Sequence, residues 1–493
     1  MRRLRMSRIW VLLMIMAAMI EAMALSGCVP KNAYQYEDIK TEYADLACPL
    51  DASRSTESAK GKCIIDKTLA LKDILTIAKT NNPDLLMAMA RIERAKAMLT
   101  QSTAPFYPQV NVYTEYVQGD APSAFLFKTI DQRKLPPNTD FNNPGWFENY
   151  ETGVGAGINL FNGGKDTLNR EMAKTGVTIS NLDRDSIENQ VMATAISAYY
   201  DILAATNFTA VAEESLETTR SQLKIMEVRF QSGGALKTDL LSLQVRMAES
   251  EEILVQSRNR QRLAKTGLAE ILGVEPDIPF GVHKAQPYAV DIPEDTASAL
   301  DVALVNRPEL AGVREKLRQS KMAADAARAG YLPQLDFQTQ YYVDDPEMRY
   351  SSERENWTAG LYLNWNIFSG FATKGQRAEA LSNLREALAA DRKTLLAVKF
   401  DVKKAYLNLD EAEERLKVAT SNVKTAEETF HLVKRQYEGG SANITRYLEA
   451  ELAYSRARMH ETTAYFDREK ARAQIARAIG YWTRNRETGS KEG

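Results

Sequence analysis

The segment WTAGLYLNWNIF, residues 357–368, alternates bulky apolar residues with small or polar ones. One face of this alternation carries Trp357, Ala359, Leu361, Leu363, Trp365 and Ile367, and the other carries Thr358, Gly360, Tyr362, Asn364 and Asn366. A period of two over about eleven residues, with aromatic residues near both ends, is typical of a membrane β-barrel strand with lipid on one face and water on the other. A half-buried strand of a soluble sheet has the same alternation, so the pattern alone fits both.

The same alternation occurs earlier in the chain, between residues 150 and 160. One face carries Tyr150, Thr152, Val154, Ala156, Ile158 and Leu160, and the other carries Glu151, Gly153, Gly155, Gly157 and Asn159. The runs that precede the two segments, residues 110–118 and 335–343, alternate less regularly. We therefore predict two strand pairs, within residues 107–162 and 332–368.

A membrane location of these strands would give their aromatic residues a role. Tyr150, Trp357 and Trp365 would then belong to an aromatic girdle that faces lipid. Four strands cannot close a barrel, for which about eight are needed, and an open sheet edge is not tolerated in lipid. Several copies of the chain would therefore have to build one barrel.

The chain is internally duplicated. The sequence NPDL at 82–85 recurs as RPEL at 307–310, an offset of 225 residues, whereas NLFNG at 159–163 recurs as NIFSG at 366–370, an offset of 207. The difference, 225 minus 207, places 18 extra residues of the first copy between Val110 and Asn159. We predict two structural repeats, residues 68–273 and 296–480, joined by a linker at 274–295 and followed by a polar tail at 481–493.

Each repeat also contains a very long helical pattern. Apolar residues follow one another in steps of three and four from Ile187 to Phe230 and again from Val398 to Tyr437, which is the signature of a coiled coil. We predict antiparallel helical hairpins at 163–273 and 370–480, with the first long helix running roughly 100 Å at 1.5 Å per residue. The return helices are shorter, so the helical segments that precede the strands must pack along the remaining length.

The N-terminus has the pattern of an export signal. Four arginines lie within the first eight residues, a short apolar run follows, and the sequence LSGC ends at Cys28. This ending resembles a bacterial lipobox and predicts a signal peptide at 1–27, a covalent lipid on Cys28 and a lipidated leader segment at 28–67. The alternative is ordinary cleavage after Ala24, which would leave Cys28 as a free thiol.

Two further cysteines remain, Cys48 and Cys63. After export they would form an even pair 15 residues apart in a polar segment, which favours a disulfide. A metal site is the weaker alternative, because no histidine lies near them in the sequence.

The composition argues against several classes of protein. With 63 basic and 65 acidic residues in 493, the chain does not bind nucleic acid by bulk charge. The mean hydropathy of −0.38 argues against a bundle of membrane-spanning helices. The three histidines, His283, His431 and His460, are scattered in the sequence, so we expect no catalytic site, no metal and no cofactor besides the lipid.

The lipobox, the duplication, the two strand pairs and the two long hairpins together resemble the TolC-like outer-membrane efflux protein family, in particular its lipoprotein branch. The resemblance extends from about residue 69 to residue 481. It implies a mainly α protein with a β-barrel part: a homotrimer whose three four-stranded contributions close a 12-stranded barrel in outer-membrane lipid, above an α-helical tunnel in the periplasm.

The resemblance also implies a function. Such a protein is the passive exit duct of a tripartite efflux or type I secretion system, docked on a periplasmic adaptor (membrane fusion) protein that is bound to an inner-membrane pump. Drug, metal and protein export are all compatible with it. The alternative is a lipid-anchored periplasmic adaptor or scaffold, which needs only one hairpin and no strands.

Site residues follow from the same resemblance. The helix turns FQSGG at 230–234 and YEGG at 437–440 correspond to adaptor-docking tips, with the candidate residues Phe230, Gly233, Gly234, Tyr437, Gly439 and Gly440. The glycines also suit the left-handed conformation that ends a helix. Asp239, Arg446 and Glu449 would form rings in a trimer and line or gate the pore, or they are solvated charges of the first helical turn. Arg446 stands where family members often carry an acid, so a cation-binding ring is not implied.

Overall fold

The computed structural model describes residues 68–283, 291–349 and 351–483. The first repeat contains α3 (Leu71–Asn81), α4 (Pro83–Thr103), β2 (Gln109–Gly119), α5 (Pro122–Asp131), β3 (Phe147–Phe161), α6 (Lys165–Gln231) and α7 (Lys237–Leu272). The second contains α8 (Thr296–Asn306), α9 (Pro308–Ala326), β5 (Gln334–Asp345), β6 (Glu355–Asn364), α10 (Ala372–Glu438) and α11 (Ile444–Ala478). Apart from α5, the two repeats follow the same order, in agreement with the expected duplication.

Short elements complete the fold. The strands β1 (Thr68–Leu69) and β4 (Gly281–Val282) pair in parallel, and the 3-10 turns η1 (Ala104–Phe106) and η2 (Ala327–Tyr331) connect the helices to the strands. No helix in the described part of the chain combines the length and the apolar character that a membrane crossing requires.

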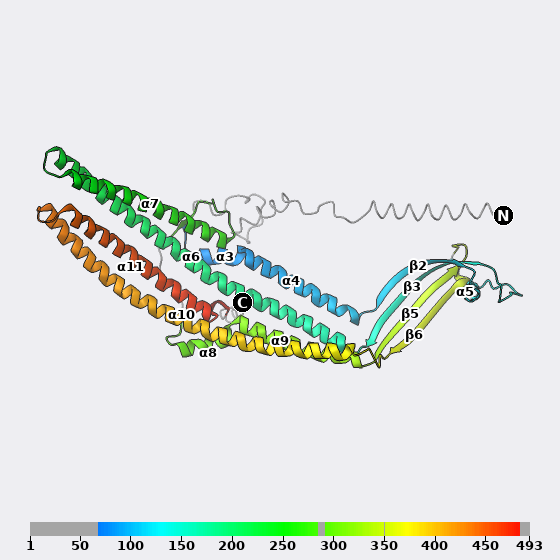
Figure 1. Ribbon diagram of the computed structural model, residues 1–493. Helices are drawn as coiled ribbons and strands as arrows, with labels where there is room; N and C mark the ends of the chain where they lie inside the picture. The colour runs from blue at the N-terminus through cyan, green and yellow to red at the C-terminus, as the bar shows by residue number, and fades with distance from the viewer. Residues whose placement is uncertain (1–67, 284–290, 350, 484–493) are drawn as a thin grey trace, which may run out of the picture. The chain divides into compact units, whose positions relative to one another are not determined.

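The long helices α6 and α10 have 67 residues each and return through α7 and α11. Figure 1 shows the two hairpins side by side, with their tip turns at one end of the helices and the four larger strands at the other. Along the half that the return helices do not reach, α4 packs on α6, and α9 packs on both α6 and α10. The expected division of each long helix between two partners is therefore confirmed.

Small side chains in the expected stripe allow this close helix packing. Buried apolar residues of α6 include Val191, Ala195, Ile202, Ala205, Ala212 and Leu216, at steps of three, four and seven. In the second repeat, alanines of α8 and α11 pack with valines of α10 in one cluster. Alanine at such positions brings helix axes together without a loss of helix propensity.

The four larger strands form one antiparallel sheet in the order β2-β3-β5-β6. Strand β6 ends at Asn364, four residues before the end of the alternating run, because Asn364 already pairs with Gln334, the first residue of β5. Beyond this pair β5 offers no further partner, so residues 365–368 leave the sheet. The strands have 10 to 15 residues, enough for a tilted transmembrane strand of about 9–11.

The strand register sorts side chains onto two distinct faces. One face is apolar across all four strands and carries Val110, Val112, Tyr116, Val154, Ile158, Phe337, Tyr341, Trp357, Leu361 and Leu363. The other is polar and carries Asn111, Glu115, Glu151, Asn159, Asp336, Gln338, Gln340, Asp344, Asn356 and Asn364. The alternation expected for a strand between lipid and water is thus present in every strand of the sheet.

Candidate functional site

The two hairpin tips have the same backbone conformation at positions 207 residues apart. Gly233 and Gly440 both adopt a left-handed conformation, with φ of 79° and 77°. The N–H of Gly233 donates to the carbonyl of Phe230 over 3.0 Å, and that of Gly440 donates to the carbonyl of Tyr437 over 3.1 Å. Each turn therefore ends its long helix through a glycine that needs positive φ.

The aromatic residue before each turn lies in a different environment. Tyr437 is buried and packs on Tyr447, with ring centroids 5.1 Å apart, whereas Phe230 is 38% exposed. The guanidinium of Arg229 lies 5.9 Å from the ring centre of Tyr437. Burial raises the pKa of Tyr437, opposed by Arg229 and assisted by Asp239, so its hydroxyl keeps its proton at neutral pH.

A single apolar cluster, which we call the tip cluster, joins the two hairpins just behind the turns. It contains Met226, Leu243, Phe430, Val433, Tyr437, Ile444, Tyr447 and Ala450, contributed by α6, α7, α10 and α11. Phe430 also stacks on Tyr454, with ring centroids 5.7 Å apart and planes 10° from parallel. Because all four helices contribute, a movement of one hairpin away from the other must expose this cluster.

The three charged candidates lie in the first turns of the return helices. Asp239 is half-buried near the start of α7, whereas Arg446 and Glu449 are exposed on α11. The backbone N–H of Arg446 donates to the side chain of Asn443, which caps α11, over 2.9 Å. In the described part of this single chain no salt bridge connects the three, although Arg446 and Glu449 lie about one turn apart on α11.

A buried ion pair that the sequence reasoning missed lies deeper between the hairpins. Arg246 of α7 and Glu451 of α11 are 2.8 Å apart, and their side chains are 7% and 4% exposed. Ser215 of α6 and Ser455 of α11 donate to the same oxygen of Glu451 over 2.6 Å and 3.0 Å. A buried pair with this many hydrogen bonds fixes how its helices sit, because losing one partner leaves an unpaired charge in the interior.

The helical pattern contained a signal for this pair. Arg246 stands in the buried stripe of α7, three residues after Leu243 and four before Ser250. Glu451 lies four residues after Tyr447 in the buried stripe of α11. A charged residue at a stripe position of both return helices indicates a buried partner across the hairpins.

The girdle candidates differ in exposure. Trp357 and Trp365 are 73% and 56% exposed, whereas only 6% of Tyr150 is exposed. Tyr150 lies on the expected apolar face, but its ring packs on that of Tyr116, with centroids 4.7 Å apart. Its hydroxyl donates to Glu148 over 3.3 Å. Tyr150 therefore packs within the sheet, unlike the two exposed tryptophans.

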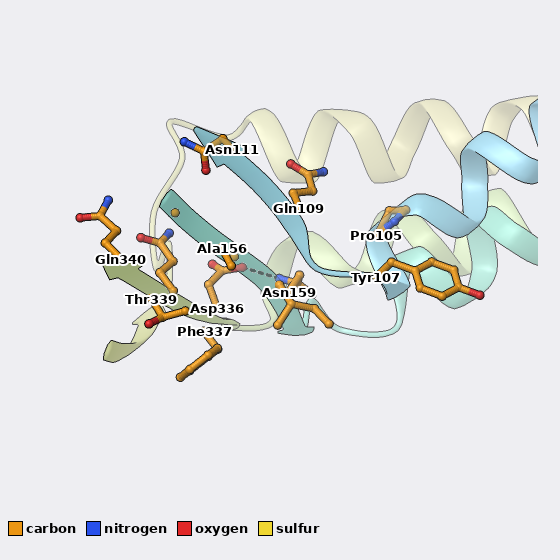
Figure 2. Close-up of a pocket in the computed structure, with 14 residues that line it drawn as sticks. Pro105, Tyr107, Gln109, Asn111, Ala156, Asn159, Asp336, Phe337, Thr339 and Gln340 are labelled. Carbon is orange, nitrogen blue, oxygen red and sulfur yellow. Dashed lines mark hydrogen bonds between the residues drawn. The ribbon is translucent and has the colours of Figure 1, made fainter. Parts of the chain in front are cut away.

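The polar face of the sheet forms a shallow hollow near the helices. Its volume is about 390 Å³, and its lining includes Asn111, Gly155, Asn159, Asp336, Gln338 and Gln340. Figure 2 shows this lining, in which the amide of Asn159 donates to Asp336 over 2.8 Å. Amide and carboxylate groups spread over three strands provide a water-compatible surface rather than a pocket for one ligand.

The described residues hold no group of three or more His, Cys, Asp and Glu side chains that could bind a metal ion. The lipid-attachment candidate Cys28 and the possible disulfide of Cys48 with Cys63 lie outside the described residues.

Comparisons with known proteins agree with this architecture. The sequence profile of the family described as "Outer membrane efflux protein" matches residues 74–274 and 299–481, one block for each repeat. The pyoverdine export outer membrane protein OpmQ of Pseudomonas aeruginosa is 21% identical over 83% of this chain and 85% of its own length. The probable outer membrane lipoprotein SilC of Salmonella typhimurium is 19% identical over 76% and 77% of the two chains.

A solved structure shows the same fold. The CmeC outer membrane channel of Campylobacter jejuni superposes with a TM-score of 0.73 at 16% identity, covering 88% of this chain and 94% of its own. The expected fold class, mainly helical with long hairpins and four strands in each chain, is thus confirmed.

Proposed function

Because this chain belongs to the outer membrane efflux protein family, whose members are outer-membrane channels of tripartite efflux or secretion systems and not enzymes, we propose that it is a passive exit duct opened at its periplasmic tip by an adaptor protein. The observation that carries the proposal is the four-stranded sheet, which is apolar on one face and polar on the other. The alternative, a lipid-anchored periplasmic adaptor, would not need such a sheet.

The edges of the sheet support a trimer. In the observed order, β2 and β6 are the outer strands, and each has one partner within the chain. Unpaired strand edges are not tolerated in lipid, so β2 of one copy would pair with β6 of the next. Three copies would supply twelve strands, with the apolar faces toward lipid and the polar faces around a water-filled lumen.

We propose that Cys28 carries the lipid anchor. The sequence LSGC at 25–28 follows a basic segment and a short apolar run, as a lipoprotein signal does. The name of the Salmonella typhimurium relative, a probable outer membrane lipoprotein, supports the same assignment. The lipid would hold the leader segment at the membrane, and no other cofactor is part of the proposal.

The tips are the proposed docking site for the adaptor. Phe230 and Leu236 remain exposed on either side of the first turn, at 38% and 68%. Exposed apolar side chains at the far end of a helical hairpin are suited to a helical partner. An inner-membrane pump bound to the adaptor would supply the energy.

The gate would be a shift between two packed arrangements of the hairpins. In a threefold assembly Asp239, Arg446 and Glu449 of the three copies would surround the tip opening, where oppositely charged residues can pair between copies. Binding of the adaptor would favour the open arrangement. The exposure of Arg446 and Glu449 in the single chain leaves them available for such contacts.

The proposal is tested by the single-channel conductance of the purified protein in planar bilayers. We expect a small conductance for the wild type and a several-fold larger one for Asp239→Ala or Arg446→Ala. Lys417→Ala, which removes a charge that is 78% exposed in the middle of α10, is the matched control and should change nothing. Wild-type pores that are indifferent to both tip variants would refute the gate, and folded trimers that do not conduct even when they carry the tip substitutions would refute the duct.

A further inference from the structure

Helix α5 occupies the connection between β2 and β3, where the first repeat has its 18 extra residues, 225 minus 207. In the second repeat the described part of the same connection contains only the short turn η3 (Ser352–Arg354). Because β2 runs away from the helical hairpins, α5 lies at the far end of the sheet, as Figure 1 shows. In the proposed channel this end is the extracellular mouth.

Lys128 fixes α5 to the polar face of the sheet. Its ammonium group forms salt bridges with Glu151 of β3 and with Asp344 of β5, the latter over 3.1 Å. Asp344 is fully buried, and Glu151 also accepts a hydrogen bond from Tyr113 of β2 over 2.8 Å. Burial alone would lower the pKa of Lys128, but its hydrogen bonds to the two carboxylates raise it above the usual value, so the contact stays charged.

The end of α5 is fixed to the same face. Gln132 donates from its amide to the side chain of Asn149 over 2.8 Å and to the carbonyl of Glu148 over 2.9 Å. Arg133 donates to the side chain of Asn356 on β6 over 3.0 Å. These contacts hold the helix across β3, β5 and β6, on the side of the sheet that would face the lumen.

The opposite side of α5 is apolar and uncovered in the single chain. Phe125 and Thr129 are buried against the sheet, whereas Phe127 and Ile130 are 66% and 42% exposed. Two exposed apolar residues three positions apart lie on one face of a helix. A helix that lies on the lumenal side of a closed barrel points this face at the axis, where the same face of the other copies also points.

From this arrangement we infer that the three copies of α5 in the proposed trimer pack together through Phe127 and Ile130 and form an apolar lid at the extracellular mouth, held in place by the salt bridges of Lys128 to Glu151 and Asp344. The inference rests on the proposed trimeric duct. The occupant of the apolar face of α5 is a second copy of this chain. Such a lid narrows the extracellular mouth independently of the tip gate: small ions still pass it, so conductance reports on the tip, whereas bulky cargo passes only after α5 leaves the sheet.

Cross-linking of purified protein tests the lid. In a chain with Cys48 and Cys63 replaced by serine, Phe127→Cys is treated with a homobifunctional maleimide, and covalent dimers and trimers are counted on a denaturing gel. We expect most of the protein to be cross-linked. Val112→Cys, 75% exposed on the apolar face of β2, is the control and should stay monomeric on the same gel.

A second pair of variants tests the role of Lys128. Adding Lys128→Met to Phe127→Cys should reduce the cross-linked yield at least threefold, because α5 loses the two salt bridges that fix its middle to β3 and β5. Lys134→Met is the matched control: Lys134 lies 3.9 Å from Glu347, both side chains are nearly half exposed, and its loss should leave the yield unchanged. Equal yields from both methionine variants would overturn the role of Lys128.

The remaining outcomes separate the lid from the duct. If the native protein is a trimer but Phe127→Cys stays uncross-linked, the lid is wrong and the duct stands. Rapid labelling of Phe127→Cys in intact cells by a bulky impermeant maleimide would also overturn the lid, since the apolar face would then point outward. A protein that is not trimeric on a native gel would refute the proposed duct, and the lid with it.

Discussion

The root of each hairpin, where the return helix ends against the start of α4 or α9, is the same in both repeats. Gly273 and Gly480 end α7 and α11 in a left-handed conformation, with φ of 67° and 71°. The cap residue of α4, Asn82, donates to the carbonyl of Ile271 over 2.8 Å, and that of α9, Arg307, donates to the carbonyl of Ala478 over 3.2 Å. The residue type changes between the repeats, but the contact is kept.

The tips and the outer connections, in contrast, differ between the repeats. Tyr437 is buried where Phe230 is exposed, and among the described residues a helix such as α5 occurs in the first repeat alone. The buried ion pair also has no repeat-related copy, because position 453 is alanine and position 244 is glutamine at the offset of 207. The contacts that occur in both repeats hold the helices of each hairpin in place. The regions proposed to bind the adaptor, to gate the tip and to close the mouth are those in which the two repeats differ.

The largest loss of stability is expected at the buried ion pair of Arg246 and Glu451, which has no repeat-related copy. Glu451→Gln or Arg246→Met should lower the free energy of unfolding by about 3–5 kcal/mol, because each leaves a buried charge without its partner. The thermal unfolding midpoint of the purified protein in detergent measures this loss.

A double variant distinguishes pairing from general damage. Arg246→Met with Glu451→Met removes both charges and should recover most of the lost stability. Arg220→Met, whose partner Glu217 is on the same helix and whose side chain is 55% exposed, should change the midpoint very little. Additive losses in the double variant would show that the two residues do not act as a pair.

The next largest effect tests the symmetry of the roots. A Cβ at position 480 would lie 2.8 Å from the carbonyl oxygen of Asn306, and one at position 273 would lie even closer to that of Asn81. Gly273→Ala and Gly480→Ala should therefore each cost roughly 2–4 kcal/mol, since steric overlap adds to the strain of positive φ. Thermal unfolding of the two variants should give similar losses.

Gly267→Ala is the matched control for the roots. Gly267 lies within α7 with open space around it, so alanine should be neutral or stabilise the helix by up to about 1 kcal/mol. Strongly unequal losses for Gly273→Ala and Gly480→Ala would mean that the roots are equivalent in geometry but not in energy.

At the tips, a smaller effect on stability should distinguish the residue that packs the helices, Tyr437, from the residue proposed to bind the adaptor, Phe230. Tyr437→Ala should cost about 2 kcal/mol because it opens the tip cluster, whereas Phe230→Ala should change stability by less than about 0.5 kcal/mol. If Phe230 docks the adaptor, Phe230→Ala should still reduce co-purification of the adaptor from native membranes several-fold. Unchanged co-purification with unchanged stability would remove Phe230 from the docking site.

The sequence predicted the elements whose pattern is regular and local. The alternating runs, most regular at 357–368, and the apolar stripes of α6 and α10 were sufficient to predict four strands and two hairpins. Each of these patterns repeats over many residues. The duplication strengthened both predictions, because the pattern of each element occurs in both repeats.

The sequence failed where structure depends on distant partners. Helix α5 was not predicted, because its ten residues are too few for a clear helical period and Asp344, the partner of Lys128, lies 216 residues away in the sequence. Glu451 is 205 residues from Arg246, and no local rule pairs them. The roles proposed for Asp239, Arg446 and Glu449 depend on other copies of the chain, which the pattern of one chain does not contain.

The smallest effect concerns the glycine pairs of the tips, which are displaced by one residue between the repeats: Gly233 and Gly234 in the first, Gly439 and Gly440 in the second. Only Gly233 and Gly440 have positive φ, so Gly233→Ala and Gly440→Ala should each cost about 1 kcal/mol in thermal unfolding. Gly439→Ala should cost less than about 0.5 kcal/mol, because Gly439 has a φ of −83° that alanine adopts freely. An equal cost at Gly439 and Gly440 would mean that the turn needs two flexible residues. Costs at Gly233 and Gly440 with little or none at Gly439 would show that one left-handed position defines the tip in both repeats, and that Gly439, the other glycine of the second pair, is free to change.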